Sequence, residues 1–287
     1  MQIGRPVESL LLLPLGVLMA GALVVPASIL FYYSLFDFTL LKPVGDPTLA
    51  NYAAALTRPA NGAYVTNTLW IALPTTVLSV VAGYLLAYYL IFGRSRRRNL
   101  IFVLVLSALT ASYLVRIYAW RTLLGDSGII NSALLSAGAI HEPVGFLLFS
   151  RLAVILAEIS LFTPFAALAF YAALAGISPD YREVSRDLGA GPLQTLWRIT
   201  VPLSGRAILA ATAVIFFLAC GDYITPVLVG GPDSQTIGVV IAGAFGQSGA
   251  YGLGAALSFV TLLAFIGLYL ALRASLRATR ILPMTVE

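Results

Sequence analysis

Six long apolar windows, separated by short polar breaks, constrain the fold of this chain more than any other feature. They cover residues 10–36, 64–92, 100–124, 147–174, 207–228 and 253–272. Each window provides the roughly 20 apolar residues that a helix needs to cross the hydrocarbon core of a bilayer. The chain is 60% hydrophobic and 10% charged, whereas soluble domains carry about 25% charged residues. The sequence therefore predicts an all-α integral membrane protein with six transmembrane helices.

The length of the chain favours one membrane domain. Six spans with short connections use most of the 287 residues. We therefore expect residues 1–287 to form a single transmembrane domain, without a soluble catalytic domain of ordinary size. The first window resembles a signal peptide, because Arg5 precedes it and small residues lie near Ala27. Its apolar run is too long for a signal peptide, so we interpret it as a span.

The distribution of basic residues predicts the orientation. With the N-terminus inside, the inner segments carry twelve arginines and the rest of the chain carries five basic residues. The twelve are Arg5, Arg94, Arg96, Arg97, Arg98, Arg182, Arg186, Arg198, Arg206, Arg273, Arg277 and Arg280. Because Lys and Arg near span ends stay on the cytoplasmic side, we expect both termini in the cytoplasm. The basic cluster at 94–98 is then a cytoplasmic anchor rather than a nucleic-acid site.

The longest inner segment, residues 176–205, contains the signals of a helical hairpin. A serine, a proline and an aspartate at 178–180 begin a helix without strain. An apolar stripe follows at Tyr181, Val184 and Leu188. Gly189 is expected to end this helix with a positive φ, and a second short helix is expected over 191–197.

An apolar stripe on a solvated hairpin needs a surface that covers it. That surface is either the chain's own helical bundle, the lipid headgroups or a partner protein. The physical properties of these residues leave the three alternatives open.

The spacing within this segment resembles the EAA loop of binding-protein-dependent ABC permeases. Glu183 is followed after six residues by Gly189, after ten more by Ile199, and then by a hydrophobic residue and Pro202. The chain departs from the family pattern, with little change in size, at Val184, Ser185 and Val201.

This resemblance implies a fold like that of a type I ABC importer permease, in a bacterial inner membrane. In such a family the loop between the fourth and fifth spans forms a coupling helix in a cleft of the ATP-binding subunit. The coupling residues that it implies are Glu183, Arg186, Leu188, Gly189, Ala190, Ile199 and Pro202. The partners that it implies are a dimer of ATP-binding subunits, a second homologous permease and a periplasmic substrate-binding protein, in addition to membrane lipid.

Two further regions are similar to spermidine/putrescine-type permeases. They cover residues 112–120 with 125–131, and residues 221–226 with 230–234. The first region contains the run Ser-Tyr-Leu-Val-Arg-Ile-Tyr-Ala-Trp, and the second contains Gly-Asp-Tyr-Ile-Thr-Pro. The resemblance implies a polyamine or a related amine as substrate. Relatives of this type also carry opines, amino acid derivatives and phosphonates, so these alternatives stay open.

The residues themselves support ATP hydrolysis on another chain. A phosphate-binding loop needs Gly-x-x-x-x-Gly-Lys-Ser/Thr, and the only lysine, Lys42, follows Leu41. We therefore expect ATP and Mg²⁺ on a separate subunit, and no catalytic residue, cofactor or metal site on this chain. His141 is expected to be solvated, and Cys220 to be a small apolar filler.

Several residues near the outer ends of the spans are candidates for a substrate pathway. At helical rise, Arg116 and Asp222 lie about 24 Å along their spans from the cytoplasmic end. Tyr113, Arg116 and Trp120 share one helical face by their spacing, and Tyr223 adjoins the acid. The group is either an aromatic belt with a snorkelling arginine, paired with Asp222, or an entrance where a binding protein releases its ligand.

Glu158 is the most specific pathway candidate. It lies about 13 Å below the outer end of the fourth window at helical rise, a depth where an ionised carboxylate is costly and often functional. Thr163 and Pro164 follow it, and a proline there loosens the helix below the acid. Glu158 is either a neutral or hydrogen-bonded contact between helices, or a pathway carboxylate that attracts a cationic amine.

Two other classes of membrane protein compete with this interpretation. A gradient-driven secondary transporter should show charged relays or broken helices in paired halves. A membrane enzyme should show titratable groups clustered at one membrane face. The sequence shows neither pattern clearly, so an ATP-driven importer is favoured.

Overall fold

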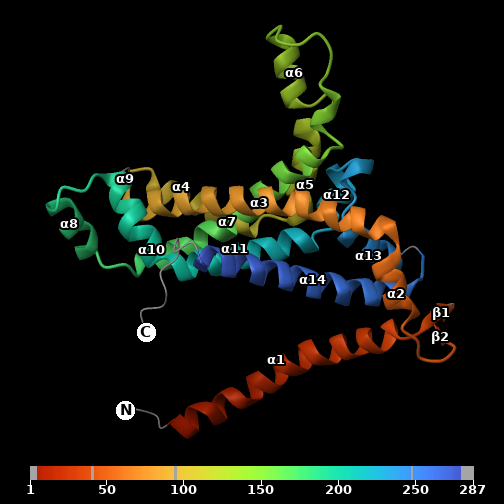
Figure 1. Ribbon diagram of the computed structural model, residues 1–287. Coiled ribbons are helices and arrows are strands. Elements are labelled where there is room, and N and C mark those ends of the chain that lie inside the picture. Colours follow the sequence, from red (N-terminus) through yellow and green to blue (C-terminus); the bar gives the residue numbers. More distant parts are fainter. Residues whose placement is uncertain (1–4, 40–41, 94–95, 247, 279–287) are drawn as a thin grey trace. The chain divides into compact units, whose positions relative to one another are not determined.

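Figure 1 shows the computed structural model, which describes residues 5–39, 42–93, 96–246 and 248–278. The chain forms two compact units, Met1–Gly62 with Val240–Leu263 and Ala63–Val239 with Ala264–Glu287. We call them the first and the second unit. Helices α3 (Pro59–Phe92), α13 (Ile237–Gly246) and α14 (Tyr251–Ala278) contribute residues to both units. The expectation of a single domain over 1–287 stays a prediction.

The first unit begins with α1 (Arg5–Ser34), a long apolar helix. Its stretch Pro14–Ser34 has a mean hydropathy of 2.1, and 0% of the apolar window is buried inside the protein. A helix of this composition needs lipid or another protein chain around it. The first predicted window therefore forms a helix suited to a membrane.

A short β-hairpin and a helix follow α1, and the hydropathy pattern predicts neither. β1 (Asp37–Thr39) pairs antiparallel with β2 (Lys42–Val44), and α2 (Ala50–Thr57) comes next. The buried Asn51 on α2 fixes the end of α1, because its amide donates to the carbonyl of Ser34 at 3.3 Å and to that of Phe36 at 3.0 Å. These bonds satisfy carbonyl groups at a helix end, where no intrahelical partner exists.

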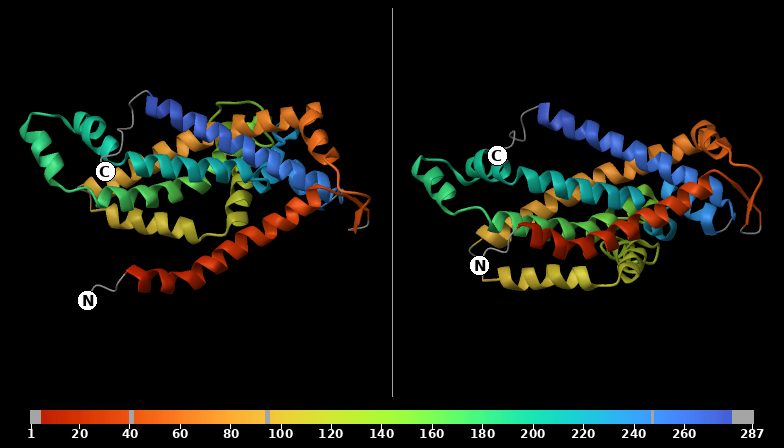
Figure 2. Two further views of the ribbon diagram at one scale, coloured as in Figure 1. Left: turned by 60° about the horizontal axis from the view of Figure 1, so that its bottom comes forward. Right: turned by 90° about the horizontal axis from the view of Figure 1, so that it is seen from below.

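The second unit is built around α7 (Arg151–Ala175), which corresponds to the fourth predicted window. α7 contacts α4 (Arg98–Thr110), α5 (Tyr113–Leu124), α11 (Gly205–Gly221) and α12 (Ile224–Val229). Both views in Figure 2 show α7 between α4 and α11. Half of the apolar window of α7, 50%, is buried inside the protein, so α7 forms the core of this unit.

Small residues bring α3 and α7 into close contact. A Cβ atom placed on Gly83 of α3 would lie 2.5 Å from the Cβ of Ala166 and 2.8 Å from the backbone nitrogen of Ala167. Membrane helices approach closely where such small residues face each other. Glycine is therefore required at this point of the helix crossing.

Two predicted windows, 100–124 and 207–228, contain a break and are not continuous helices. In the first, α4 meets the stretch that contains α5 and α6 (Ile129–Ser136) at 103°. A separate bend of 73° lies just before the second window, where the stretch Pro192–Leu203 meets α11. α11 ends at Gly221, and α12 begins at Ile224. Asp222 accounts for this second break, because its Oδ1 accepts hydrogen bonds from the backbone nitrogens of Ile224 and Thr225 and so caps the new helix.

The number of spans agrees with the prediction. Within the described residues, four helices are long and apolar enough to cross a membrane, and the number reaches 6 if each bent pair is one span. The four are Pro14–Ser34, Pro59–Phe92, Arg151–Ala175 and Tyr251–Ala271.

Candidate functional site

The segment predicted as a hairpin forms short helices at one end of the second unit (Figure 1). We call residues 178–204 the α8–α10 hairpin. Its elements are α8 (Asp180–Asp187), α9 (Pro192–Thr195), a π-helix at Leu196–Thr200 and α10 (Val201–Leu203). Gly189 has a φ of +82°, which confirms the positive φ predicted at the end of the first helix. The second helix does not stop at Trp197 as expected, because the chain continues through the π-helix.

The α8–α10 hairpin carries an exposed apolar face. Leu188 is 83% exposed, which is far from the burial of a core leucine. The other exposed apolar side chains of this face are Tyr181, Val184, Leu193 and Trp197. The predicted stripe is therefore present and does not fold back onto the second unit.

A cavity of about 310 Å³ lies within the hairpin. It is lined by Ser185, Leu188, Gly189, Ala190, Gln194, Arg198 and Ile199. Four predicted coupling residues thus share one cavity. Glu183 and Arg186 lie exposed on α8 beside it, and Pro202 lies half-buried in α10.

Glu158 lies in the core of the second unit, on α7. Its side chain is 0% exposed, and within the described residues neither carboxylate oxygen has a hydrogen-bond partner. Thr75 of α3 lies beside the carboxyl group but outside hydrogen-bond geometry. A buried polar group without a partner costs free energy, and the cost is larger for a charged group. The structure thus leaves both predictions for Glu158 open, a neutral contact between helices and a pathway carboxylate.

Three buried hydroxyl groups on the same two helices share this lack of partners among the described residues. They are those of Thr75, Ser79 and Thr163. Thr75 and Ser79 are four residues apart on α3, so they lie on one helical face. Hydroxyl residues four positions apart inside an apolar window are visible in the sequence. They could have indicated a polar face on this helix, but the hydropathy pattern, which locates only the span, does not reveal it.

Asp222 is close enough to Glu158 to interact electrostatically but is bonded quite differently. Its Oδ2 accepts hydrogen bonds of 2.5 Å from the hydroxyls of Tyr113 and Thr225. Its Oδ1 caps α12. The structure therefore brings together Tyr113 and Asp222, two predicted pathway residues from different spans. Both oxygens of the Asp222 carboxylate accept hydrogen bonds.

The remaining pathway candidates are less closely associated. Arg116 does not pair with Asp222, because its Nε and Nη1 have no hydrogen-bond partner among the described residues. Trp120 lies on the same helix, α5, and its Nε1 donates to the Ser160 hydroxyl of α7 at 2.6 Å. Tyr223 is 45% exposed next to the break in the fifth span.

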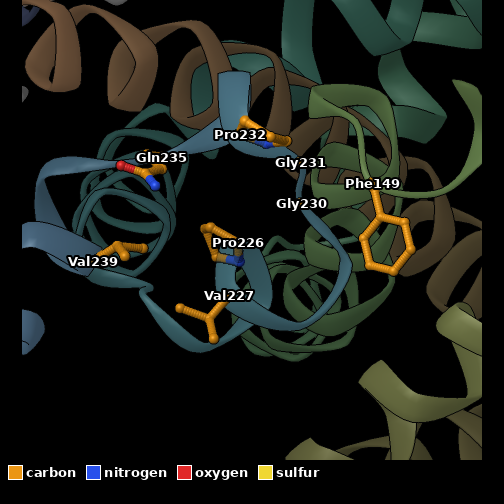
Figure 3. Close-up of a pocket in the computed structure, with 8 residues that line it drawn as sticks. All are labelled: Phe149, Pro226, Val227, Gly230, Gly231, Pro232, Gln235 and Val239. Atoms are coloured by element: carbon orange, nitrogen blue, oxygen red, sulfur yellow. The ribbon is translucent and has the colours of Figure 1, made fainter.

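A second cavity, of about 390 Å³, opens at the end of the second unit opposite the hairpin (Figure 3). It is lined by Phe149, Pro226, Val227, Gly230, Gly231, Pro232, Gln235 and Val239. Figure 3 shows Pro226 and Val227 of α12 facing Pro232 and Gln235 across the space. The cavity is mostly apolar and directly follows the Asp222 break, and the sequence does not predict it.

The wall of this cavity contains unusual backbone. Phe149 has a φ of 53°, which is uncommon for a residue other than glycine. A Cβ on Gly231 would overlap the carbonyl oxygen of Phe149, so glycine is required there. Strained backbone tends to occur at functional sites, and this places the cavity among the candidate sites of the molecule.

The sequence predicts neither a metal site nor a cofactor on this chain. Within the described ranges, no three His, Cys, Asp or Glu side chains are grouped so that they could hold a metal ion. Arg94, Ser95 and Arg280 lie outside the described residues. The orientation of the termini and the absence of a cofactor stay predictions.

Comparison with known proteins agrees with the motif-based resemblance. The sequence profile of the family described as "Binding-protein-dependent transport system inner membrane component" matches residues 48–280. The chain is 32% identical over 283 residues to the inner membrane ABC transporter permease protein YdcU of Escherichia coli (strain K12), covering 93% of this chain and 89% of that protein.

Two further relatives extend this comparison. The chain is 32% identical over 240 residues to the spermidine/putrescine transport system permease protein PotB of Escherichia coli (strain K12), covering 84% of this chain and 86% of PotB. Its fold is similar to a chain in the crystal structure of a bacterial alginate ABC transporter bound to its periplasmic protein. That match has a TM-score of 0.75 and 20% identity, over 98% of this chain and 96% of the other. At this identity the structural match shows the fold alone.

Proposed function

Because this chain belongs to the family of binding-protein-dependent transport system inner membrane components, we propose that it is the permease subunit of an ATP-driven importer of polyamines or related amines. The all-α fold of a type I importer permease, predicted from the sequence, is confirmed. The chain is a multi-pass membrane protein and a transport subunit.

The amine substrate is supported by one observation, the buried carboxylate of Glu158. Glu158 is 0% exposed, unpartnered among the described residues, and within electrostatic range of Asp222. Acids within membrane spans commonly mark substrate or ion pathways. A positively charged ammonium group compensates such a carboxylate, whereas the anionic group of a phosphonate is repelled by it. The polyamine specificity in the name of PotB agrees with this choice.

The energy source is a separate pair of ATP-binding subunits, which hold ATP and Mg²⁺. The exposed apolar face of the α8–α10 hairpin supports this division, because Leu188 and its neighbours have no cover from the second unit. The hairpin docks in a cleft of one ATP-binding subunit through Glu183, Arg186 and the residues around its cavity. Ile199 and Pro202 lie in the segment that leads from the hairpin into α11 and position it.

The remaining partners complete the transport path. A second homologous permease pairs with this chain, and a periplasmic binding protein delivers the substrate. Both termini lie in the cytoplasm, because the inner segments carry twelve arginines and the rest of the chain carries five basic residues. Asp222, Arg116, Tyr113, Trp120 and Tyr223 lie near the opposite, outer side.

The Glu158→Gln variant tests the amine pathway, because it removes the charge while conserving size. The complex is reconstituted with its ATP-binding subunits, partner permease and binding protein, and uptake of labelled putrescine and spermidine is measured per assembled complex. We expect uptake to fall by at least tenfold, in line with the loss of a buried charge interaction.

Glu142→Gln is the matched control, because Glu142 is an exposed acid outside the membrane helices. It should transport at the wild-type rate. Wild-type uptake by Glu158→Gln at all substrate concentrations would show that Glu158 is not part of an amine pathway.

A further inference from the structure

One end of α3 carries a stripe of aromatic residues that faces the α8–α10 hairpin. Tyr84, Tyr88 and Phe92 are spaced four residues apart, so they lie on one face of the helix. Two separate parts of the hairpin contact this stripe. All of these residues lie in the second unit.

The first contact is made by Arg182 of α8. Its guanidinium carbon lies 3.7 Å from the ring centre of Phe92 and 5.7 Å from that of Tyr88. A guanidinium group stacks favourably on aromatic faces because its charge meets the negative face of the ring. Its Nε has no hydrogen-bond partner among the described residues, so the aromatic rings are its main contact.

The second contact is a hydrogen bond between Tyr84 and Ser204, where the hairpin joins α11. The two hydroxyl oxygens lie 2.9 Å apart. The Ser204 hydroxyl donates to the carbonyl of Thr200 at 2.8 Å. A hydroxyl group has only one proton to donate, so Tyr84 is the donor to Ser204.

This bond is the last in a buried chain that runs through the hairpin. Thr200 donates to the carbonyl of Thr195 at 3.4 Å, and Thr195 donates to the carbonyl of Gly191 at 3.1 Å. The Thr195 oxygen also lies 2.8 Å from the Ser185 hydroxyl of α8, which is the donor because the Thr195 proton is already used. Side-chain hydroxyls and the backbone carbonyls of Thr195 and Thr200 therefore connect α8, α9, the π-helix and α3.

The π-helix lies within this chain of hydrogen bonds, and π-turns occur often at functional sites. The carbonyls of Thr200 and Gly191 each accept a backbone hydrogen bond, from Ser204 and Thr195 respectively, in addition to the bond from a hydroxyl. Ser and Thr hydroxyls bond to carbonyls of the preceding turn and bend a helix there. Each of the four hairpin hydroxyls is buried, with exposed fractions of 4% for Ser185, 2% for Thr195, 0% for Thr200 and 3% for Ser204.

Tyr84 also connects the stripe to the helix that carries Glu158. Its ring packs edge-on against Phe170 of α7, with ring centres 5.1 Å apart at 70°. Phe170 is 0% exposed. A displacement of α3 at Tyr84 therefore also displaces α7, because close-packed interiors transmit strain.

We propose that the aromatic stripe of α3 receives the movement of the hairpin, with Arg182 and Ser204 as its two points of attachment. Tyr84, Ser204 and Arg182 are positioning residues, which touch neither substrate nor nucleotide. The inference rests on the proposed function, because it assumes that the hairpin moves with the ATP-binding subunits. It adds the route by which that movement enters the membrane helices.

Tyr84→Phe tests this route, because it removes one hydroxyl and keeps the ring on Phe170. In the reconstituted complex, ATP hydrolysis is measured with and without loaded binding protein, and uptake is measured per ATP hydrolysed. We expect the ratio of stimulated to basal hydrolysis, and the uptake per ATP, to fall about fivefold, the change that corresponds to one net hydrogen bond. A purely structural role would change the amount of assembled complex and leave both ratios unaltered.

Tyr89→Phe is the matched control on the same helix. Tyr89 is 37% exposed, and among the described residues its hydroxyl makes no hydrogen bond to the hairpin. Both ratios should equal those of the wild type.

A double-mutant cycle keeps the test sharp if one variant assembles poorly. Ser204→Ala should lower both ratios as Tyr84→Phe does, and the double variant should be no worse than either single variant, because both remove the same bond. Additive losses would contradict a shared route.

Arg182→Lys keeps the charge but loses the planar stack, and should lower the ratios about as much as Arg182→Gln.

The outcomes separate this inference from the proposed function. If the wild-type complex shows no ATP-dependent uptake, the proposed function is wrong, and the inference falls with it. If the wild type transports and both Tyr84→Phe and Ser204→Ala keep wild-type ratios, the proposed function stands and the α3 route is wrong.

Discussion

A carboxylate in the middle of a membrane helix is stable only if it is neutral, paired or matched by a cation. Glu158 and Asp222 meet this requirement differently. Asp222 accepts hydrogen bonds from Tyr113, from Thr225 and from the start of α12. Glu158 accepts none among the described residues. The two acids therefore differ in their bonding: Asp222 caps α12 at the break in the fifth span, whereas Glu158 has an unbonded carboxyl group, as the proposed amine pathway requires.

Gly83 is the residue at which the packing of α3 on α7 is most sensitive to size. Gly83→Ala places a methyl group 2.5 Å from the Cβ of Ala166, so the helices must separate. We expect a loss of about 1–3 kcal/mol of stability, as for other overpacked cores. Thermal unfolding of the purified protein in detergent measures this loss.

Gly267→Ala provides the comparison, because Gly267 lies on a helix with no atom within 4 Å of an added Cβ. Its melting temperature should stay at the wild-type value or rise slightly, since alanine favours helix more than glycine does. Equal melting temperatures for the two variants would show that α3 and α7 do not approach closely at Gly83.

At the scale of elements, the α8–α10 hairpin depends on one left-handed residue. Gly189 has a φ of +82° and no atom within 4 Å of an added Cβ, so a substitution there changes backbone strain rather than packing. Gly189→Val puts a β-branched side chain in a region that such residues avoid. We expect the complex to insert and to lose ATP-driven uptake, measured together with the amount of chain in the membrane.

Gly191→Val serves as the control for this variant. Gly191 is extended, with a φ of −70°, and an added Cβ there also has no atom within 4 Å. It should transport normally, because valine adopts this conformation readily. Normal transport by Gly189→Val would show that the hairpin geometry does not matter for coupling.

The sequence predicts the elements better than their breaks. Apolar windows mark the spans because bilayer thickness fixes their length. They do not mark the bend between α4 and α5, nor the cap that Asp222 gives to α12, because a polar group inside an apolar window is visible only when its partners are known. The β-hairpin at Asp37–Thr39 and Lys42–Val44 is too short to give a period in the sequence.

The same limit applies to the sites. The helix-start residues at 178–180, the apolar stripe and Gly189 predict the hairpin and the positive φ of Gly189, because those features are local. Tyr84 and Ser204 are far apart in the sequence, at a separation of 120 positions. Only the fold brings them together, so the route from the hairpin to α3 cannot be predicted from the sequence.

At the scale of the whole molecule, the proposed function makes this chain one half of a translocation path. The second unit holds the α8–α10 hairpin at one end and the cavity beside Asp222 at the other, with Glu158 in its core. The exposed apolar surfaces of α1 and of the hairpin are suited to lipid and to partner chains. With these apolar surfaces uncovered, the chain is not suited to exist as a soluble monomer.

The most direct test of the central claim is the energy source of uptake. Vesicles containing this chain, its partner permease and the ATP-binding subunits are supplied with loaded binding protein, and labelled putrescine uptake is measured with ATP on the hairpin side and with an ion gradient alone. We expect uptake that requires ATP hydrolysis and is insensitive to collapse of the gradient. Uptake that follows the gradient and proceeds without ATP would contradict it and identify a secondary transporter.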